Sequence, residues 1–116
     1  MHYLFLAYED EGRADIPPHP DRSPLERGYW VNEDALRRSG HLVAAADMRG
    51  ADANKTVRIR GGEVISAGSG TIWTNVQLAS IFLIDARDLN DAIRVACAMP
   101  HARGGLIEVR PMSSIS

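Results

Sequence analysis

The stretch "ASIFLIDA", residues 79–86, is a continuous run of mainly apolar and branched side chains. Such a run is typical of a β-strand that is covered on both faces, so we expect it near the centre of the fold. Asp88 then provides an N-cap for a helix that ends before Pro100. One face of that helix is predicted to comprise Leu89, Ala92, Ile93, Ala96 and Cys97.

The sequence before this run predicts two further strands and a helix. Residues 2–8, "HYLFLAY", and residues 41–48, "HLVAAADM", both have the composition of strands. Between them, a proline-rich loop leads to Ser23, which is a candidate helix N-cap followed by Pro24 at the first helical position. We expect this helix to end at Gly40, because glycine commonly terminates helices.

The clearest local signal is a β-hairpin in "TVRIRGGEVIS", residues 56–66. Two strand-like runs separated by Gly-Gly match a two-residue turn of the mirror-image class. A last strand is predicted for "GLIEVRP", residues 105–111, in which apolar and other residues alternate. The turn register of the hairpin pairs Arg60 with Glu63 and Ile59 with Val64.

The predicted order is strand, helix, strand, inserted hairpin, strand, helix and strand, within a single domain of residues 1–116. This is the split βαβ pattern of a ferredoxin-like α+β fold, with a β-hairpin inserted at its middle. Both helices then lie on one face of the sheet, and the other face is bare unless a partner covers it. We therefore expect a homodimer.

Charge and composition argue against several classes of partner. The chain has 13 Lys and Arg against 15 Asp and Glu, a net charge of −2, and its basic residues are spread along the sequence. This is a weak electrostatic match for nucleic acid or an anionic membrane. No apolar run approaches the roughly 18 residues of a membrane span, and the lone Cys97 cannot form an internal disulfide. We predict a cytoplasmic protein that binds neither nucleic acid nor membrane.

Four stretches together resemble a known family. They are "MHYLFLAYEDEG", "TVRIRGGEV", "QLASIFLIDARDLNDAIRVA" and "MPHARGGLIEVRPM", and they cover nearly the whole chain in order. The sequence resembles the YCII-related superfamily, specifically its DGPF branch. The resemblance implies a dimeric α+β barrel of ferredoxin-like topology. It implies little about activity, since most members are uncharacterised.

The sequence departs from this family at two places that bear on function. Aligned from the hairpin glycine, residues 68–71 are Gly-Ser-Gly-Thr where the branch has Asp-Gly-Pro-Phe, so the namesake motif is not retained. Some members of the superfamily have a His and an Asp on the first helix, proposed as a catalytic pair. Those positions fall on or near Tyr29 and Arg38, so that chemistry cannot be carried over, although Tyr29 could still donate a proton.

The Gly-Ser-Gly segment is open to more than one interpretation. Its N–H groups could form an anion nest, but strand-like sequence follows it and the Gly-Lys-Ser/Thr ending of a phosphate-binding loop is absent. Ser69 lacks the Gly-x-Ser-x-Gly surroundings of a serine nucleophile. We therefore interpret the segment as a flexible loop. Trp73, just after it, is expected either to cover a ligand cavity or to pack across a dimer interface.

The histidines and other polar residues give weaker signals. The four histidines have no metal-ligand spacing, so we predict no metal site, and no motif indicates a cofactor. His101 and Arg103 could bind a carboxylate or a phosphate where the last strand begins. The alternative, which we favour, is that they cap the carbonyls of the preceding helix. Asp47 and Arg58 are further candidate pocket residues that surface ion pairs would also explain.

Two functions of different classes follow from these residues. In the first, the protein is a non-catalytic or accessory homodimer that binds a small molecule between the sheet and the helices, which suits the lost motifs. In the second, it is a small-molecule lyase or isomerase that uses Tyr29, Asp47 or His101 for proton transfer. The candidate pocket residues are Tyr29, Asp47, Arg58, Ser69, Trp73, His101 and Arg103.

Overall fold

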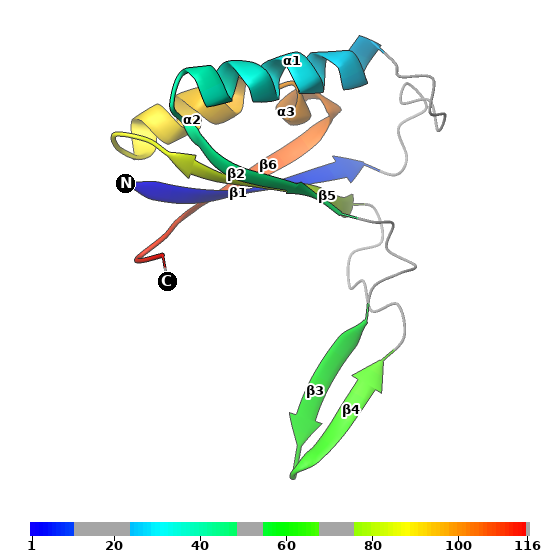
Figure 1. Ribbon diagram of the computed structural model, residues 1–116. Coiled ribbons are helices and arrows are strands. Elements are labelled where there is room, and N and C mark those ends of the chain that lie inside the picture. Colours follow the sequence, from blue (N-terminus) through cyan, green and yellow to red (C-terminus); the bar gives the residue numbers. More distant parts are fainter. Residues whose placement is uncertain (11–23, 49–54, 68–75, 116) are drawn as a thin grey trace.

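The fold consists of three helices and six strands within the described part of the chain (Figure 1). A computed structural model describes residues 1–10, 24–48, 55–67 and 76–115, without the side chains of 10, 24–30, 56, 65–67 and 76. In chain order the elements are β1 (His2–Asp10), α1 (Pro24–Arg38), β2 (Leu42–Asp47), β3 (Thr56–Arg60), β4 (Glu63–Ala67), β5 (Val76–Asp85), α2 (Leu89–Ala98), α3 (His101–Gly104) and β6 (Gly105–Pro111).

Four strands form one antiparallel sheet in the order β2-β5-β1-β6, while β3 and β4 pair with each other as a separate two-stranded sheet. This α+β arrangement is compatible with the predicted ferredoxin-like pattern. The apolar run 79–86 forms most of β5, which lies between β1 and β2 as expected for the most apolar strand. The short helix α3 was not predicted as an element of its own.

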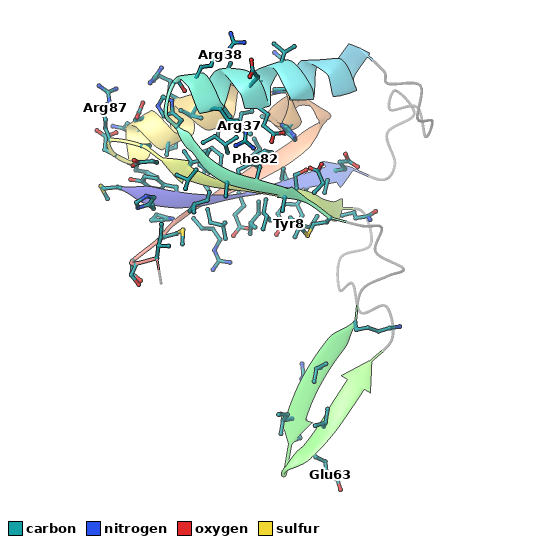
Figure 2. The ribbon with its side chains drawn as sticks, in the orientation of Figure 1. Tyr8, Arg37, Arg38, Glu63, Phe82 and Arg87 are labelled. Carbon is teal, nitrogen blue, oxygen red and sulfur yellow. The ribbon has the colours of Figure 1, made fainter. Side chains whose placement is uncertain are left out.

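The hydrophobic core lies between this sheet and the helices. In β1, Tyr3, Phe5 and Ala7 are at most 2% exposed, and Phe5 pairs across the ladder with Phe82 of β5. The helices supply Leu36 of α1 and several small residues of α2 to the same cluster. Figure 2 shows Phe82 on the helix-covered side of the sheet. Full burial of such side chains stabilises the fold by about 1.5–3 kcal/mol each.

The opposite side of the sheet, which we term the open face, is mainly apolar along β1 and β5, whereas β6 places the ion pair of Glu108 and Arg110 on it. Side chains alternate between the two faces along each strand, so the residues that alternate with the core residues point away from the helices. None of the described helices lies over this side, where Tyr8 is seen in Figure 2. The expectation that β5 is covered on both faces therefore holds on only one face of a single chain. The open face includes Leu4, Leu6, Tyr8, Ile81, Leu83 and Leu106.

The β3–β4 hairpin has the predicted turn and register. Gly61 and Gly62 have φ values of +57° and +81°, as a mirror-image turn requires, and the two predicted cross-strand pairs are formed. The hairpin extends away from the four-stranded sheet on the side opposite the helices (Figure 1). The Cα radius of gyration is 16.0 Å, whereas a compact domain of this length has about 13 Å, which is consistent with this projection.

The two longer helices differ in how well the sequence predicts them. Helix α1 ends before Gly40, whose φ is +83°, as expected for a terminating glycine, whereas its predicted N-cap Ser23 lies outside the described residues. Asp88 caps α2 as predicted by accepting a hydrogen bond from the backbone N–H of Asp91. The predicted buried face of α2 is wrong in part, because Leu89, Ile93 and Cys97 are exposed.

The rotation of α2 has a physical reason. Its buried positions are Asp91, Ala92, Val95 and Ala96. The side of α2 that faces the interior therefore includes the Asp91 carboxylate, and the side with Leu89 and Ile93 faces outward. The polar contacts of Asp91 described below hold this orientation. At the start of β6, Gly105 allows a close approach between two backbones, because a Cβ there would lie 1.9 Å from the carbonyl oxygen of Tyr8.

Candidate functional site

A hydrogen bond between two strands begins the candidate site. Asp47 is the last residue of β2 and pairs in register with Ser80 of β5. The Ser80 hydroxyl donates to Asp47 Oδ1 at 2.9 Å. Ser80 is 7% exposed, while Asp47 is exposed, so one partner is fixed in the protein and the other reaches solvent. Both residues lie on the helix-covered face of the sheet, because Ser80 pairs with the buried Ala7.

His101 lies on the same face as this pair. It is the first residue of α3, is 9% exposed, and its ring meets Phe82 edge to face with 5.0 Å between ring centroids. Phe82 follows Ser80 by two residues and therefore projects from the same side of β5. Asp47, Ser80 and His101 thus form a cluster on one face, which we term the Asp47–His101 cluster.

Burial determines the charge of His101. The loss of hydration lowers the pKa of His101 to about 4, and the negative charge of Asp47 opposes this shift without cancelling it. The imidazole is therefore neutral at physiological pH. A neutral imidazole has one nitrogen that donates and one that accepts a hydrogen bond. The cluster as a whole consequently carries one negative charge, on Asp47.

A buried amide group on α1 faces the same side of the sheet. Asn32 precedes the core residue Leu36 by four residues, which places the two on one side of the helix. Its Nδ2 is buried and has no hydrogen-bond acceptor among the described residues. Leaving a buried donor in this state costs roughly 1–3 kcal/mol. A bound acceptor at this position would remove that cost.

The structure brings together only part of the predicted pocket. Asp47 and His101 share the cluster, whereas Arg58 lies exposed on β3, in the projecting hairpin. Arg103 lies exposed in α3, two residues after His101. Tyr29 belongs to α1, but its side chain is outside what is described. Ser69 and Trp73 lie outside the described residues altogether. Neither Ser80, which lies within an apolar run, nor Asn32 has a separate signal in the sequence.

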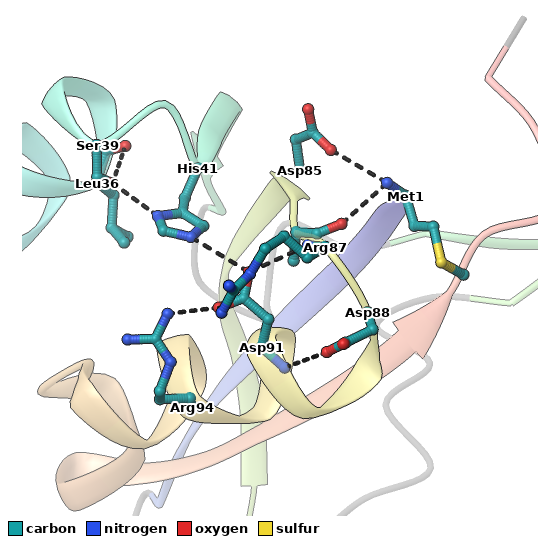
Figure 3. A network of polar contacts seen from close by, with 10 residues as sticks. Met1, Leu36, Ser39, His41, Asp85, Arg87, Asp88, Asp91 and Arg94 are labelled. Carbon is teal, nitrogen blue, oxygen red and sulfur yellow. Dashed lines mark hydrogen bonds and ion pairs between the residues drawn. The ribbon is translucent and has the colours of Figure 1, made fainter.

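A second polar cluster surrounds Asp91 of α2 (Figure 3). Its carboxylate accepts a hydrogen bond from the backbone N–H of Arg87 at 3.0 Å and from the guanidinium of Arg94. Arg87 and His41 also approach it, at 3.5 and 3.6 Å. The hydrogen bond from the Arg87 backbone, followed by that from Arg94, lowers the pKa of Asp91 below its usual range. The spacing Asp88-x-x-Asp91 is the sequence signal for such a capped helix start.

Ser39, His41 and Asp91 lie in an order that resembles a catalytic triad. Ser39 Oγ is 2.7 Å from His41 Nδ1, and His41 Nε2 is 3.6 Å from Asp91 Oδ2. The Ser39 hydroxyl, however, donates its proton to the carbonyl oxygen of Leu36 at 3.0 Å. Its oxygen is thus the acceptor toward His41, which is opposite to the direction needed to activate a nucleophile. We interpret this cluster as a structural link between the end of α1 and the start of α2.

Within residues 1–10, 24–48, 55–67 and 76–115, no group of three or more His, Cys, Asp or Glu side chains is placed to hold a metal ion. Of the helices in those same segments, none is both long enough and apolar enough to span a bilayer.

The fold and the site define a small α+β domain with helices on one face of a four-stranded antiparallel sheet. The sequence matches the YCII-related domain over residues 1–116, and the chain belongs to this family. No curated protein matches it closely enough for an activity to be carried over. The narrower assignment to the DGPF branch stays a prediction.

Proposed function

We propose that this YCII-related protein is a cytoplasmic homodimer that binds a small molecule at the Asp47–His101 cluster, without using the cluster for acid–base catalysis. The observation that supports this function best is the buried, neutral His101 beside Phe82 and the Asp47–Ser80 pair. Polar groups that converge on one side of an otherwise apolar layer are typical of ligand sites.

The low pKa of His101 favours binding over catalysis. General acid–base catalysis is most effective when the pKa of the catalytic group lies near the working pH. A histidine with a pKa of about 4 is a weak base at neutral pH and is not protonated to act as an acid. It retains its hydrogen-bonding groups and its aromatic ring, which are suited to recognition.

The charges of the cluster indicate the class of ligand. The Asp47 carboxylate can accept hydrogen bonds from a ligand N–H or O–H group and repels an anion. Asn32 Nδ2 is a buried donor on the same side of the sheet. A small, polar molecule that is neutral or cationic and carries both donors and an acceptor therefore fits better than a carboxylate or a phosphate. This differs from the anionic ligand that Arg103 suggested in the sequence.

The second candidate function is a lyase or isomerase. It is supported by the position of Asp47 and His101 on one face, near enough for the charge of one to influence the pKa of the other. In this alternative the exposed Asp47 carboxylate, held by Ser80, abstracts the proton. It predicts that a ligand of the class above is consumed, whereas the binding module returns it unchanged.

The ligand site is tested by NMR titration of the labelled protein with three probes: ethanolamine, 1,2-propanediol and acetate. We expect ethanolamine or the diol to shift the signals of Ser80 and His101, and acetate to leave them unchanged. Asp47→Asn should weaken this response at least about tenfold, because a charge-assisted hydrogen bond is lost. The matched control is Asp85→Asn, which removes an exposed carboxylate at the other end of β5, the strand that contains Ser80. No shift with any probe, or equal shifts in Asp47→Asn, would refute the site.

The proposed homodimer rests on the open face. Leu4, Leu6, Ile81 and Leu83 form contiguous apolar surface that no described helix covers, and Leu106 beside them is 47% exposed. Large exposed apolar patches are uncommon on monomeric proteins. Two sheets that pack through such faces lie about 10 Å apart, and a dimer of this kind is the α+β barrel implied by the family resemblance.

Light scattering tests the dimer. The wild-type protein is expected to have twice the mass of the 12.7 kDa chain at micromolar concentration. Leu6→Lys places a charge in the centre of the open face and should give a folded monomer by circular dichroism. Val31→Lys is the control, because Val31 is 69% exposed on α1. A wild-type mass of one chain would contradict the proposal, as would a Leu6→Lys protein that dimerises normally.

A further inference from the structure

The β3–β4 hairpin has an apolar face of its own. Val57 and Ile59 are two residues apart on β3 and so point to the same side, and Val64 pairs directly with Ile59. These three side chains, which we term the hairpin stripe, are 66%, 68% and 67% exposed. Each is β-branched and therefore favours a strand. Strand preference alone, however, does not explain why all three apolar side chains lie on one exposed side of the hairpin.

A two-stranded hairpin is marginally stable by itself in water. Here β3 and β4 belong to no larger sheet, and the exposure of the hairpin stripe shows that the four-stranded body does not cover it. The stability that packing would supply is therefore missing in one chain. Another surface must provide it.

The position of the hairpin identifies that surface. Figure 1 shows β3 and β4 projecting on the side of the open face, opposite α1 and α2. A second copy that occupies the open face consequently lies beside the hairpin. Five residues of β3 span about 17 Å, more than the about 10 Å between two packed sheets, so the hairpin is long enough to pass the sheet of the other copy.

Charge supports the same partner. Residues 55–67 contain three basic residues and one acidic residue, a formal charge of +2. Since the whole chain carries −2, the remainder carries −4. A basic hairpin beside an acidic body is electrostatically complementary, which favours association and fixes its orientation. An unrelated partner would require a complementary surface for which the chain gives no indication.

We propose that the hairpin of each copy docks through Val57, Ile59 and Val64 onto the other copy, so that two hairpins are exchanged around a two-fold axis. This inference rests on the proposed homodimer and adds a second contact region to it. An isologous arrangement makes both hairpins equivalent. The hairpin inserted into the ferredoxin-like pattern is, on this account, a dimerisation arm.

A triple variant tests the role of the stripe. Threonine is β-branched like valine and isoleucine and retains strand preference, so Val57→Thr, Ile59→Thr and Val64→Thr together should leave the hairpin intact while removing apolar contact. We expect the dimer dissociation constant, measured by analytical ultracentrifugation, to rise at least about tenfold. Val31→Thr is the matched control, because the side chain of Val31 is equally exposed but lies on α1.

A direct measurement shows which chain the hairpin touches. In a 1:1 mixture of methyl-labelled and unlabelled protein, isotope-filtered NOEs report contacts between different copies only. We expect such NOEs from the methyl groups of Val57, Ile59 and Val64, and we expect their loss when the mixture is diluted below the dissociation constant.

The outcomes separate this inference from the dimer itself. If the triple variant dimerises like the wild type while Leu6→Lys is monomeric, the open-face dimer stands and the docking of the hairpin is wrong. If the variant weakens the dimer but no NOE crosses between copies, the stripe acts within its own chain and the inference is also wrong. A monomeric wild-type protein overturns both.

Discussion

The two faces of the four-stranded sheet are formed by alternate residues of the same strands, yet only one of them is covered. Phe5 is fully buried under the helices, whereas its neighbour Leu6 points to the open face and is half-buried. In a sheet that faces water on one side, apolar and polar residues normally alternate. Here both sets are largely apolar on the central strands β1 and β5, and charged residues, Glu108 and Arg110, alternate with apolar ones only on the edge strand β6 among these three strands. The comparison indicates that the two central strands have the composition of a layer with two covered faces.

The difference between the faces predicts a large difference between two adjacent substitutions. Phe5→Ala removes a fully buried ring from the core and should lower the free energy of unfolding by about 3–5 kcal/mol at every protein concentration. Leu6→Ala removes a half-buried side chain and should cost the single chain about 1 kcal/mol or less. Its further effect should appear only at concentrations at which dimers form, because binding stabilises the folded state by mass action.

Urea unfolding at two protein concentrations measures both quantities. If Phe5→Ala does not fold, Phe5→Leu provides a milder change, with an expected loss below about 1.5 kcal/mol. Equal, concentration-independent losses for Phe5→Ala and Leu6→Ala would show that the two faces are equivalent within one chain. That result would remove the basis for a second copy on the open face.

Most of the fold could be predicted from the sequence, because its signals are local. The Gly-Gly turn fixed the hairpin register, and β6 has the predicted ends, Gly105 and Pro111. The buried side of α2 could not be predicted correctly, since two overlapping apolar stripes have the helical period. The orientation is determined by the contacts of Asp91 with groups outside its helix, such as His41, which lies fifty residues earlier.

The candidate site could be predicted only in part for a similar reason. Asp47 and His101 were recognisable as polar residues next to strand ends. Their common face, however, depends on which residues pair between β2 and β5 and on where the short helix α3 packs. Ser80 joins them only because it lies opposite Asp47, thirty-three positions away in the chain. Such a register follows from the packing of the whole sheet. Asn32 is likewise a donor whose importance depends on its burial, which the helical pattern does not report.

The last prediction concerns the covered face alone and has a smaller expected effect. The pKa of His101 is about 4 in the folded protein, whereas an ordinary histidine has 6.5. Between these values the unfolded chain binds a proton that the folded chain does not. The free energy of unfolding is therefore highest above about pH 6.5 and falls as the pH is lowered toward about 4, by about 3 kcal/mol at most.

The variant His101→Phe tests this pH dependence. It keeps a ring against Phe82 and should reduce the change in the free energy of unfolding, measured with urea, between pH 4 and 7. Val31→Phe, which adds a ring at an exposed position of α1 and removes no titratable group, should retain the wild-type slope. An unchanged slope in His101→Phe would mean that the titrating group lies elsewhere, and the neutral imidazole on which the binding function depends would lose its support.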